Sequence, residues 1–140
     1  MKISSQQMVD NPNLLDAYLF TKMRLYDPVE PHDGRMYLMP HMFGPDHPEL
    51  WSPSEDASIT QELMEKHSIG VEHIPHRKLW ASYRPDGHFY QEAPTRLKAQ
   101  LLCLASFLSV LDENGEEDED LVRGKYEIPN ALYHGLTKEN

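Results

Sequence analysis

Residues 51–111 contain the stretch of sequence that decides the fold. They read W-S-P-S-E-D-A-S-I-T-Q-E-L-M-E-K-H-S-I-G-V-E-H-I at 51–74, K-L-W-A-S-Y-R-P-D-G-H-F-Y at 78–90 and A-P-T-R-L-K-A-Q-L-L-C-L-A-S-F-L at 93–108. The order of apolar, turn and capping residues predicts a helix, three short strands and a second helix. The first helix is expected over 53–66, because Ser52, Pro53 and Glu55 match a capping box with proline at the first helical position.

The three strands are expected over 69–74, 79–83 and 88–91. P-H-R-K joins the first two, and R-P-D-G joins the last two. In the second turn proline fixes one dihedral angle and glycine adopts a left-handed one. Because connections this short join antiparallel strands, we predict a three-stranded antiparallel meander.

Two further helices are predicted from apolar periodicity. The helix over 94–111 carries a leucine stripe that includes Leu101 and Leu104, and it is apolar around so much of its surface that we expect it at the centre of the core. A helix over 12–25 begins with the capping residue Asn11. The predicted fold is therefore α+β, with a three-stranded antiparallel sheet packed with helices in an alpha-beta-alpha sandwich.

Length and charge bound the domain organisation. The chain has 140 residues, which suits a single domain over 1–111, followed by an acidic linker and short C-terminal arm over 112–140. The run D-E-N-G-E-E-D-E-D at 112–120 holds seven acids, so the remaining residues carry −10 + 7 = −3 of the net charge. Such a run repels itself and is typical of a linker. Residues 121–140 are compatible with a short strand or one turn of helix.

Composition also excludes several classes of function. A net charge of −10 argues against direct binding to nucleic acid or to an anionic membrane. No apolar run reaches the roughly 18 residues of a membrane span, and the N-terminus lacks the apolar core of a signal peptide. The single cysteine suits a reducing compartment. We therefore expect a cytoplasmic protein.

Four short motifs resemble phage proteins of the NinX-like family, small accessory proteins that contain the phage alpha-beta-alpha sandwich domain. They are L-L-D-A-Y-L-F-T-K at 14–22, W-S-P-S-E-D at 51–56, A-P-T-R-L-K-A at 93–99 and Y-E-I-P-N-A-L at 126–132. The chain departs from the family at Ala93, where threonine is usual before the proline. The resemblance implies the sandwich fold and a phage or prophage origin in the cytoplasm of a host bacterium. It carries over no cofactor and no catalytic residue.

Eight histidines invite a metal hypothesis. His73 and His76 bracket a proline in a predicted hairpin, while His41 and His47 flank G-P-D with Asp46 beside them. A zinc site needs three or four convergent ligands, whereas these histidines fall on separate loops and no H-E-x-x-H motif or cysteine pair accompanies them. We interpret them as turn and surface residues, and we expect no metal and no cofactor.

Catalytic interpretations are equally weak. Cys103 lies in the middle of the apolar helix, where cysteine behaves as a small hydrophobic residue. The carboxylates at 46, 49, 55 and 56 surround the predicted start of a helix, where capping and the helix dipole account for them. No glycine-rich phosphate loop is present. The sequence thus gives no support for an enzyme.

A partner-binding surface is the better hypothesis. The segment 28–50 is long and rich in proline, and such connections commonly carry function. Its aromatic and methionine residues, with the tryptophan that follows, are of the types that dominate interfaces. The candidate contact residues are Met36, Tyr37, Met39, Met42, Phe43 and Trp51.

The leading functional expectation is a non-enzymatic phage or prophage accessory protein that binds a host or phage protein, with host defence as a process that it would modulate. An acidic DNA mimic, which inhibits a nucleic-acid-binding host protein, is the alternative. It ranks second because mimics spread carboxylates over a surface, whereas here they concentrate in one run. A small metal-dependent enzyme is third and rests on the histidines alone.

Overall fold

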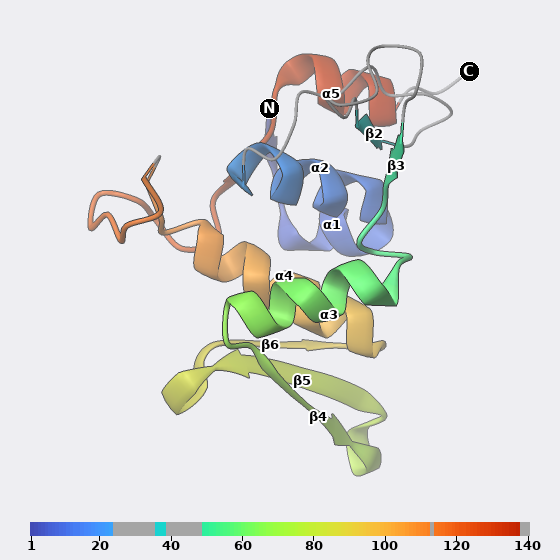
Figure 1. Ribbon diagram of the computed structural model, residues 1–140, viewed down its shortest axis with the longest axis vertical. Helices are drawn as coiled ribbons and strands as arrows, with labels where there is room; N and C mark the ends of the chain where they lie inside the picture. The colour runs from blue at the N-terminus through green and yellow to red at the C-terminus, as the bar shows by residue number, and fades with distance from the viewer. Residues whose placement is uncertain (24–35, 39–48, 113, 138–140) are drawn as a thin grey trace. The chain divides into compact units, whose positions relative to one another are not determined.

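The computed structural model describes residues 1–23, 36–38, 49–112 and 114–137, with the backbone alone at 36–38 and 49–51 (Figure 1). The described residues form two compact units, Met1–Ser52 with Lys125–Asn140, and Pro53–Gly124. Residues 112–124 belong to the second unit and 125–140 to the first. The domain boundary that the sequence predicts after residue 111 stays a prediction.

The second unit contains the three-stranded antiparallel sheet that the sequence predicts. Strands β4 (Gly70–Ile74), β5 (Leu79–Arg84) and β6 (His88–Ala93) are hydrogen-bonded in that order, with Gly70 opposite Tyr83 and Trp80 opposite Ala93. Two 3-10 turns, η1 (Pro75–Arg77) and η2 (Pro85–Gly87), connect them. Gly87 has a φ of 76°, as its place in the P-D-G turn predicts.

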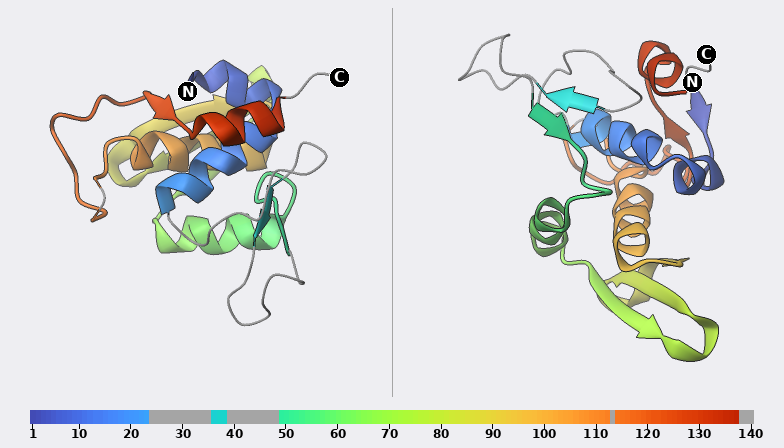
Figure 2. Two further views of the ribbon diagram at one scale, coloured as in Figure 1. Left: turned by 90° about the horizontal axis from the view of Figure 1, so that it is seen from above. Right: turned by 90° about the vertical axis from the view of Figure 1, so that its right-hand side faces the viewer.

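Two helices complete this unit, α3 (Ala57–Lys66) and α4 (Arg96–Leu108). Helix α4 contacts all three strands, and α3 packs against α4 (Figures 1 and 2). Leu101 and Leu104 are both 0% exposed, which confirms their predicted place in the core. The mixed α+β class and the antiparallel sheet packed against helices are therefore confirmed. Within the described residues, no helix is both long and apolar enough to cross a bilayer.

The predicted start of the helix over 53–66 is wrong by four residues. Asp56 is the N-cap, and its carboxylate accepts hydrogen bonds from the backbone N–H groups of Ser58 and Ile59 at 2.9 and 3.3 Å. Pro53 is instead buried in the preceding turn, where its carbonyl accepts a 2.7 Å hydrogen bond from the Thr60 hydroxyl. The side chain of Asp56 thus satisfies the helix terminus, and Ser52 is not the cap.

Helix α4 is also shorter than the predicted 94–111. Thr95 caps it by accepting a 3.3 Å hydrogen bond from the backbone N–H of Lys98. Beyond its end the acidic run folds back in a short antiparallel bridge between Leu111 and Glu117. The carboxylate of Asp112 accepts hydrogen bonds from the N–H groups of Asn114 and Glu116. Part of the acidic run therefore forms local turns.

The first unit joins the two ends of the chain. Strands β1 (Lys2–Ile3) and β7 (Tyr126–Glu127) pair antiparallel, with Ile3 opposite Tyr126. The rings of Tyr18 and Tyr126 meet edge to face at 5.0 Å. Helix α5 (Asn130–Leu136) packs against α2 (Pro12–Met23). These contacts show where β7 and α5 lie, which the sequence alone did not predict.

Helix α1 (Ser5–Asp10) is a further element that was not predicted. It has a complete capping box, in which Ser4 accepts from the N–H of Gln7 at 3.1 Å and the Gln7 side chain accepts from the N–H of Ser4 at 2.8 Å. Helix α2 begins at Pro12 as predicted and is described to Met23; the last two residues of the predicted helix lie outside the described residues. Strands β2 (Met36–Leu38) and β3 (Glu49–Trp51) pair antiparallel in the same unit.

Candidate functional site

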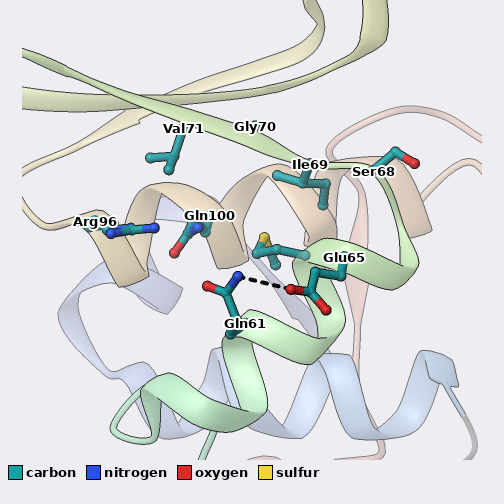
Figure 3. Close-up of a pocket in the computed structure, with 9 residues that line it drawn as sticks. Gln61, Glu65, Ser68, Ile69, Gly70, Val71, Arg96 and Gln100 are labelled. Atoms are coloured by element: carbon teal, nitrogen blue, oxygen red, sulfur yellow. Dashed lines mark hydrogen bonds between the residues drawn. The ribbon is translucent and has the colours of Figure 1, made fainter.

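A pocket of about 320 Å³ lies within the second unit, between α3, the start of β4 and α4 (Figure 3). Its apolar surface comes from Met64, Ile69 and Val71. The other lining residues are mostly polar and come from both helices, from the turn between α3 and β4 and from the first residue of β4. They are Gln61, Glu65, Ser68, Gly70, Arg96 and Gln100.

A tight reversal after α3 creates this pocket. The backbone N–H of His67 bonds to the carbonyl of Leu63 at 3.1 Å, and that of Ile69 bonds to the carbonyl of Met64 at 3.0 Å. Ser68 adopts a φ of 55°, the left-handed conformation that commonly ends a helix. The chain thereby turns directly from α3 into β4, so that the last turns of the helix face the first residues of the strand.

Gln100 is the most informative residue of the pocket. It is 4% exposed and its side chain lines the cavity, yet among the described residues its amide has no hydrogen-bond partner (Figure 3). The amide atoms themselves are not sealed from solvent, because among the described residues only Tyr18 and His67 hold fully buried side-chain polar atoms without a partner. Its amide is therefore available to a ligand that enters the pocket.

Arg96 lies one helical turn before Gln100 on α4, so both side chains are on the same face. Its guanidinium group lines the pocket and forms no ion pair with any described residue. Arg96 is also the first residue of α4, where the unpaired backbone N–H groups already carry partial positive charge. Both the guanidinium group and the helix terminus favour an anion at this end of the pocket.

The opposite wall is polar but already paired. Gln61 donates a 3.2 Å hydrogen bond to the carboxylate of Glu65 one turn later on α3. The amide oxygen of Gln61 and the second carboxylate oxygen of Glu65 remain as acceptors. The lining residues include one carboxylate and no histidine or cysteine. The pocket is thus equipped to bind a polar group, and it lacks a nucleophile with an adjacent base.

A second polar cluster of this unit lies where arginine side chains stack on aromatic rings. The guanidinium carbon of Arg84 is 3.7 Å from the ring centroid of Phe107, and that of Arg123 is 4.9 Å from the ring of Phe89. The two rings meet edge to face at 5.4 Å. Arg123 also donates a 3.0 Å hydrogen bond to the hydroxyl of Ser106. These contacts join the loop after α4 to the helix and the sheet, which is a structural role.

His67 lies against this cluster. Burial lowers its pKa from the ordinary value of 6.5, and the neighbouring Lys66 and Arg84 lower it further. Its Nε2 atom is buried without a partner, and its ring meets that of Phe107 edge to face at 6.2 Å. Its hydrophobic and cationic neighbours thus disfavour protonation of this side chain.

Cys103 is buried in the core, as predicted. Burial raises the pKa of its thiol to about 11, although a hydrogen bond with Ser82 acts in the opposite direction. The thiolate that nucleophilic chemistry requires is therefore disfavoured. At the C-cap of α4, the hydroxyl of Ser109 donates a 2.6 Å hydrogen bond to the carbonyl of Ser106 and accepts one from the N–H of Gly124.

The histidines that suggested a metal site are not brought together in the described part of the chain. His73 and His76 are both exposed, and the ring of His73 lies 4.7 Å from that of Trp80. No group of three histidine, cysteine, aspartate or glutamate residues among the described positions could hold a metal ion. His41, His47 and Asp46 lie outside the described residues.

The predicted partner-binding residues are described only in part. The backbone pairing of β2 and β3 places Met36 opposite Trp51 and Tyr37 beside that pair, opposite Leu50. The side chains of these residues are not described, and the remaining candidates Met39, Met42 and Phe43 lie outside the described residues. That surface stays a prediction.

The pocket was missed by sequence analysis. One signal was available, because Arg96 in the first turn of α4 is unfavourable for the helix dipole and invites an explanation. Gln100, one turn later on an otherwise apolar helix face, was a second signal. Neither reveals which strand and helix lie opposite, so only the packing of α3 and β4 identifies the site.

No model of a known protein family matches the chain, and a comparison with curated protein sequences gives no match either. The site must therefore be interpreted from its own geometry.

Proposed function

We propose that this chain is a small, non-enzymatic protein-binding protein of the phage accessory kind, acting on a host or phage protein in the bacterial cytoplasm. The observation that supports it best is the pocket, where the amide of Gln100 and a guanidinium group without an ion pair among the described residues lie over an apolar floor. Such convergent polar groups in an apolar cavity are typical of recognition sites. The acidic net charge favours a protein partner over nucleic acid or membrane.

Specific capture of a partner tests this function. The affinity-tagged chain would be expressed in bacteria, cross-linked and purified, and the retained proteins identified by mass spectrometry. We expect at least one protein to be retained in stoichiometric amount and displaced by an excess of untagged chain. That protein, once purified, should bind the chain in calorimetry. If no protein is retained under these conditions, or if competition displaces none, the proposal is wrong.

An acidic DNA mimic is the second candidate, because Glu116, Glu117, Glu119 and Asp120 are exposed. Against it, the carboxylates of Asp112 and Asp118 accept hydrogen bonds from their own loop. Replacing the seven acids of 112–120 by neutral amides separates the two functions. A mimic should lose most of its affinity, and wild-type binding should weaken steeply with salt, since exposed charge pairs are screened over about 10 Å at 0.1 M. A protein-binding pocket should retain its affinity.

A further inference from the structure

The sheet of the second unit has two edges that differ in their regularity. In the β5–β6 pairing the register shifts between Ser82 and Arg84, and Phe89 in β6 has a φ of 59°. The β4–β5 pairing runs without a shift over all five residues of β4. Bulges and irregular backbone are common means of protecting an edge strand against pairing. The β6 edge has such irregularity, whereas β4 pairs regularly along its length and carries one charged side chain, Glu72.

Strand β4 offers an unused backbone edge. Among the described residues its only neighbour in the sheet is β5. Alternate N–H and C=O groups of an antiparallel edge strand point away from its neighbour and are free to pair with another strand. The sequence of β4, G-V-E-H-I, contains no proline or lysine that would block pairing.

The pocket begins where this edge begins. Helix α3 leads directly into β4, and both elements pack against α4. Gly70 and Val71 of β4 line the pocket together with the residues of α3 and α4 (Figure 3). A groove between an edge strand and a helix is the arrangement by which several domains bind extended peptides through added strand pairing.

The charges of the pocket indicate which side chain would enter it. Arg96 is free of ion pairs with described residues, the start of α4 adds partial positive charge, and the unpaired amide of Gln100 can donate two hydrogen bonds. A carboxylate is the group that a guanidinium fork and an amide donor recognise together. Met64 and Ile69 would contact the methylene groups that carry it.

We infer that the β4 edge and this pocket bind an extended segment of a partner protein, which adds to the sheet as a strand and places an acidic side chain against Arg96 and Gln100. This inference rests on the proposed protein-binding function and names the kind of segment that is bound. It assigns backbone pairing to β4 and side-chain selection to the pocket.

The probe is a randomised library of short displayed peptides, selected against the full chain. We expect enrichment of sequences with one aspartate or glutamate among β-branched residues. A synthetic copy of the enriched peptide should lose binding when alternate backbone amides are N-methylated and keep it when the intervening ones are. This period of two is specific for strand addition.

Three variants test the pocket against the same peptide. Arg96→Gln and Gln100→Met should each weaken binding about 10- to 100-fold, because hydrogen bonds to a charged group contribute that much. Lys98→Gln removes the same charge from the same turn of α4 outside the pocket, and it should leave the affinity unchanged. Gln100→Met retains side-chain length and removes only the polar atoms, and circular dichroism would verify that each variant is folded.

Several outcomes would overturn the inference. They are a library without enriched peptides, binding that is indifferent to the position of N-methylation, and equal losses from Lys98→Gln and Arg96→Gln. Sedimentation that shows a β4-dependent dimer unable to bind peptide would assign the edge to a second copy of this chain. If a captured cellular partner binds the wild-type chain and the Arg96→Gln variant equally, the protein-binding function stands and the pocket is not its site. If no partner is captured at all, the proposed function itself fails.

Discussion

The two compact units of this chain are assembled from different ranges of sequence. The second is continuous from Pro53 to Gly124, and its strands are joined by tight turns. The first combines residues 1–52 with 125–140, so its β1–β7 pairing joins residues more than one hundred positions apart. Loop-closure entropy disfavours such distant contacts, while short hairpins close at little cost. Local sequence signals therefore describe the second unit far better than the first.

The largest expected effect tests the core of the second unit. Leu101→Ala and Leu104→Ala should each lower the free energy of unfolding by about 2–5 kcal/mol, because both side chains are fully buried. Urea unfolding followed by circular dichroism measures it. A loss below about 0.5 kcal/mol for both variants, within the range of ordinary surface substitutions, would mean that α4 is peripheral.

The contacts that join the two ends of the chain in the first unit should contribute less to stability than the buried leucines of α4. Tyr126→Leu removes the edge-to-face contact with Tyr18 while keeping an apolar side chain, and we expect a loss of about 1–2 kcal/mol. Amide hydrogen exchange should show faster exchange in β1 and α5, with α4 unchanged. Equally faster exchange in α4 would show that the two units open together, and it would contradict the distinction drawn between them.

A smaller effect tests the corrected start of α3. Asp56→Ala should cost about 1 kcal/mol, because the carboxylate caps two backbone N–H groups. Asp56→Asn keeps a capping oxygen and should cost much less. Thermal or urea unfolding of both variants measures the difference. If the alanine and asparagine variants are equally stable, the cap lies elsewhere.

The smallest expected effect concerns pH. The folded pKa of His67 is lowered, so near pH 6.5 the unfolded chain binds more protons at this residue than the folded chain does. The His67 contribution to stability should therefore be lost as the pH falls below about 6.5 and should be complete above it. Unfolding by urea at several pH values should show a shallower dependence for His67→Gln. The exposed His76, replaced in the same way, is the matched control.

Much of the second unit was predictable because its signals are local. The P-H-R-K and R-P-D-G turns, the alternation of the strands and the leucine stripe of α4 each act over a few residues. The start of α3 was mistaken because two capping patterns, at Ser52 and at Asp56, lie close together. The hydrogen bond from Thr60 to the carbonyl of Pro53, which belongs to the preceding turn, is not visible in a linear pattern.

The candidate site was predictable only in its residue types. The sequence indicates polar groups on α4 at Arg96 and Gln100, but the residues that lie opposite them are known only from the packing of α3 and β4. The same holds for α1 and α5, whose short sequences have weak intrinsic preference for a helix. The pocket depends on the packing of α3, β4 and α4 at once.

The sequence by itself determined the α+β class, the antiparallel meander and the buried leucines of α4. The hydrophobic period, the turn residues and the apolar stripe that indicate them each depend only on residues close together in the chain. Only the tertiary structure decided the pairing of β1 with β7, the cap at Asp56 and the place of Gln100 in the pocket. Each of these depends on which distant groups compete for one donor or acceptor. That competition is settled in three dimensions, where burial removes water as the alternative partner.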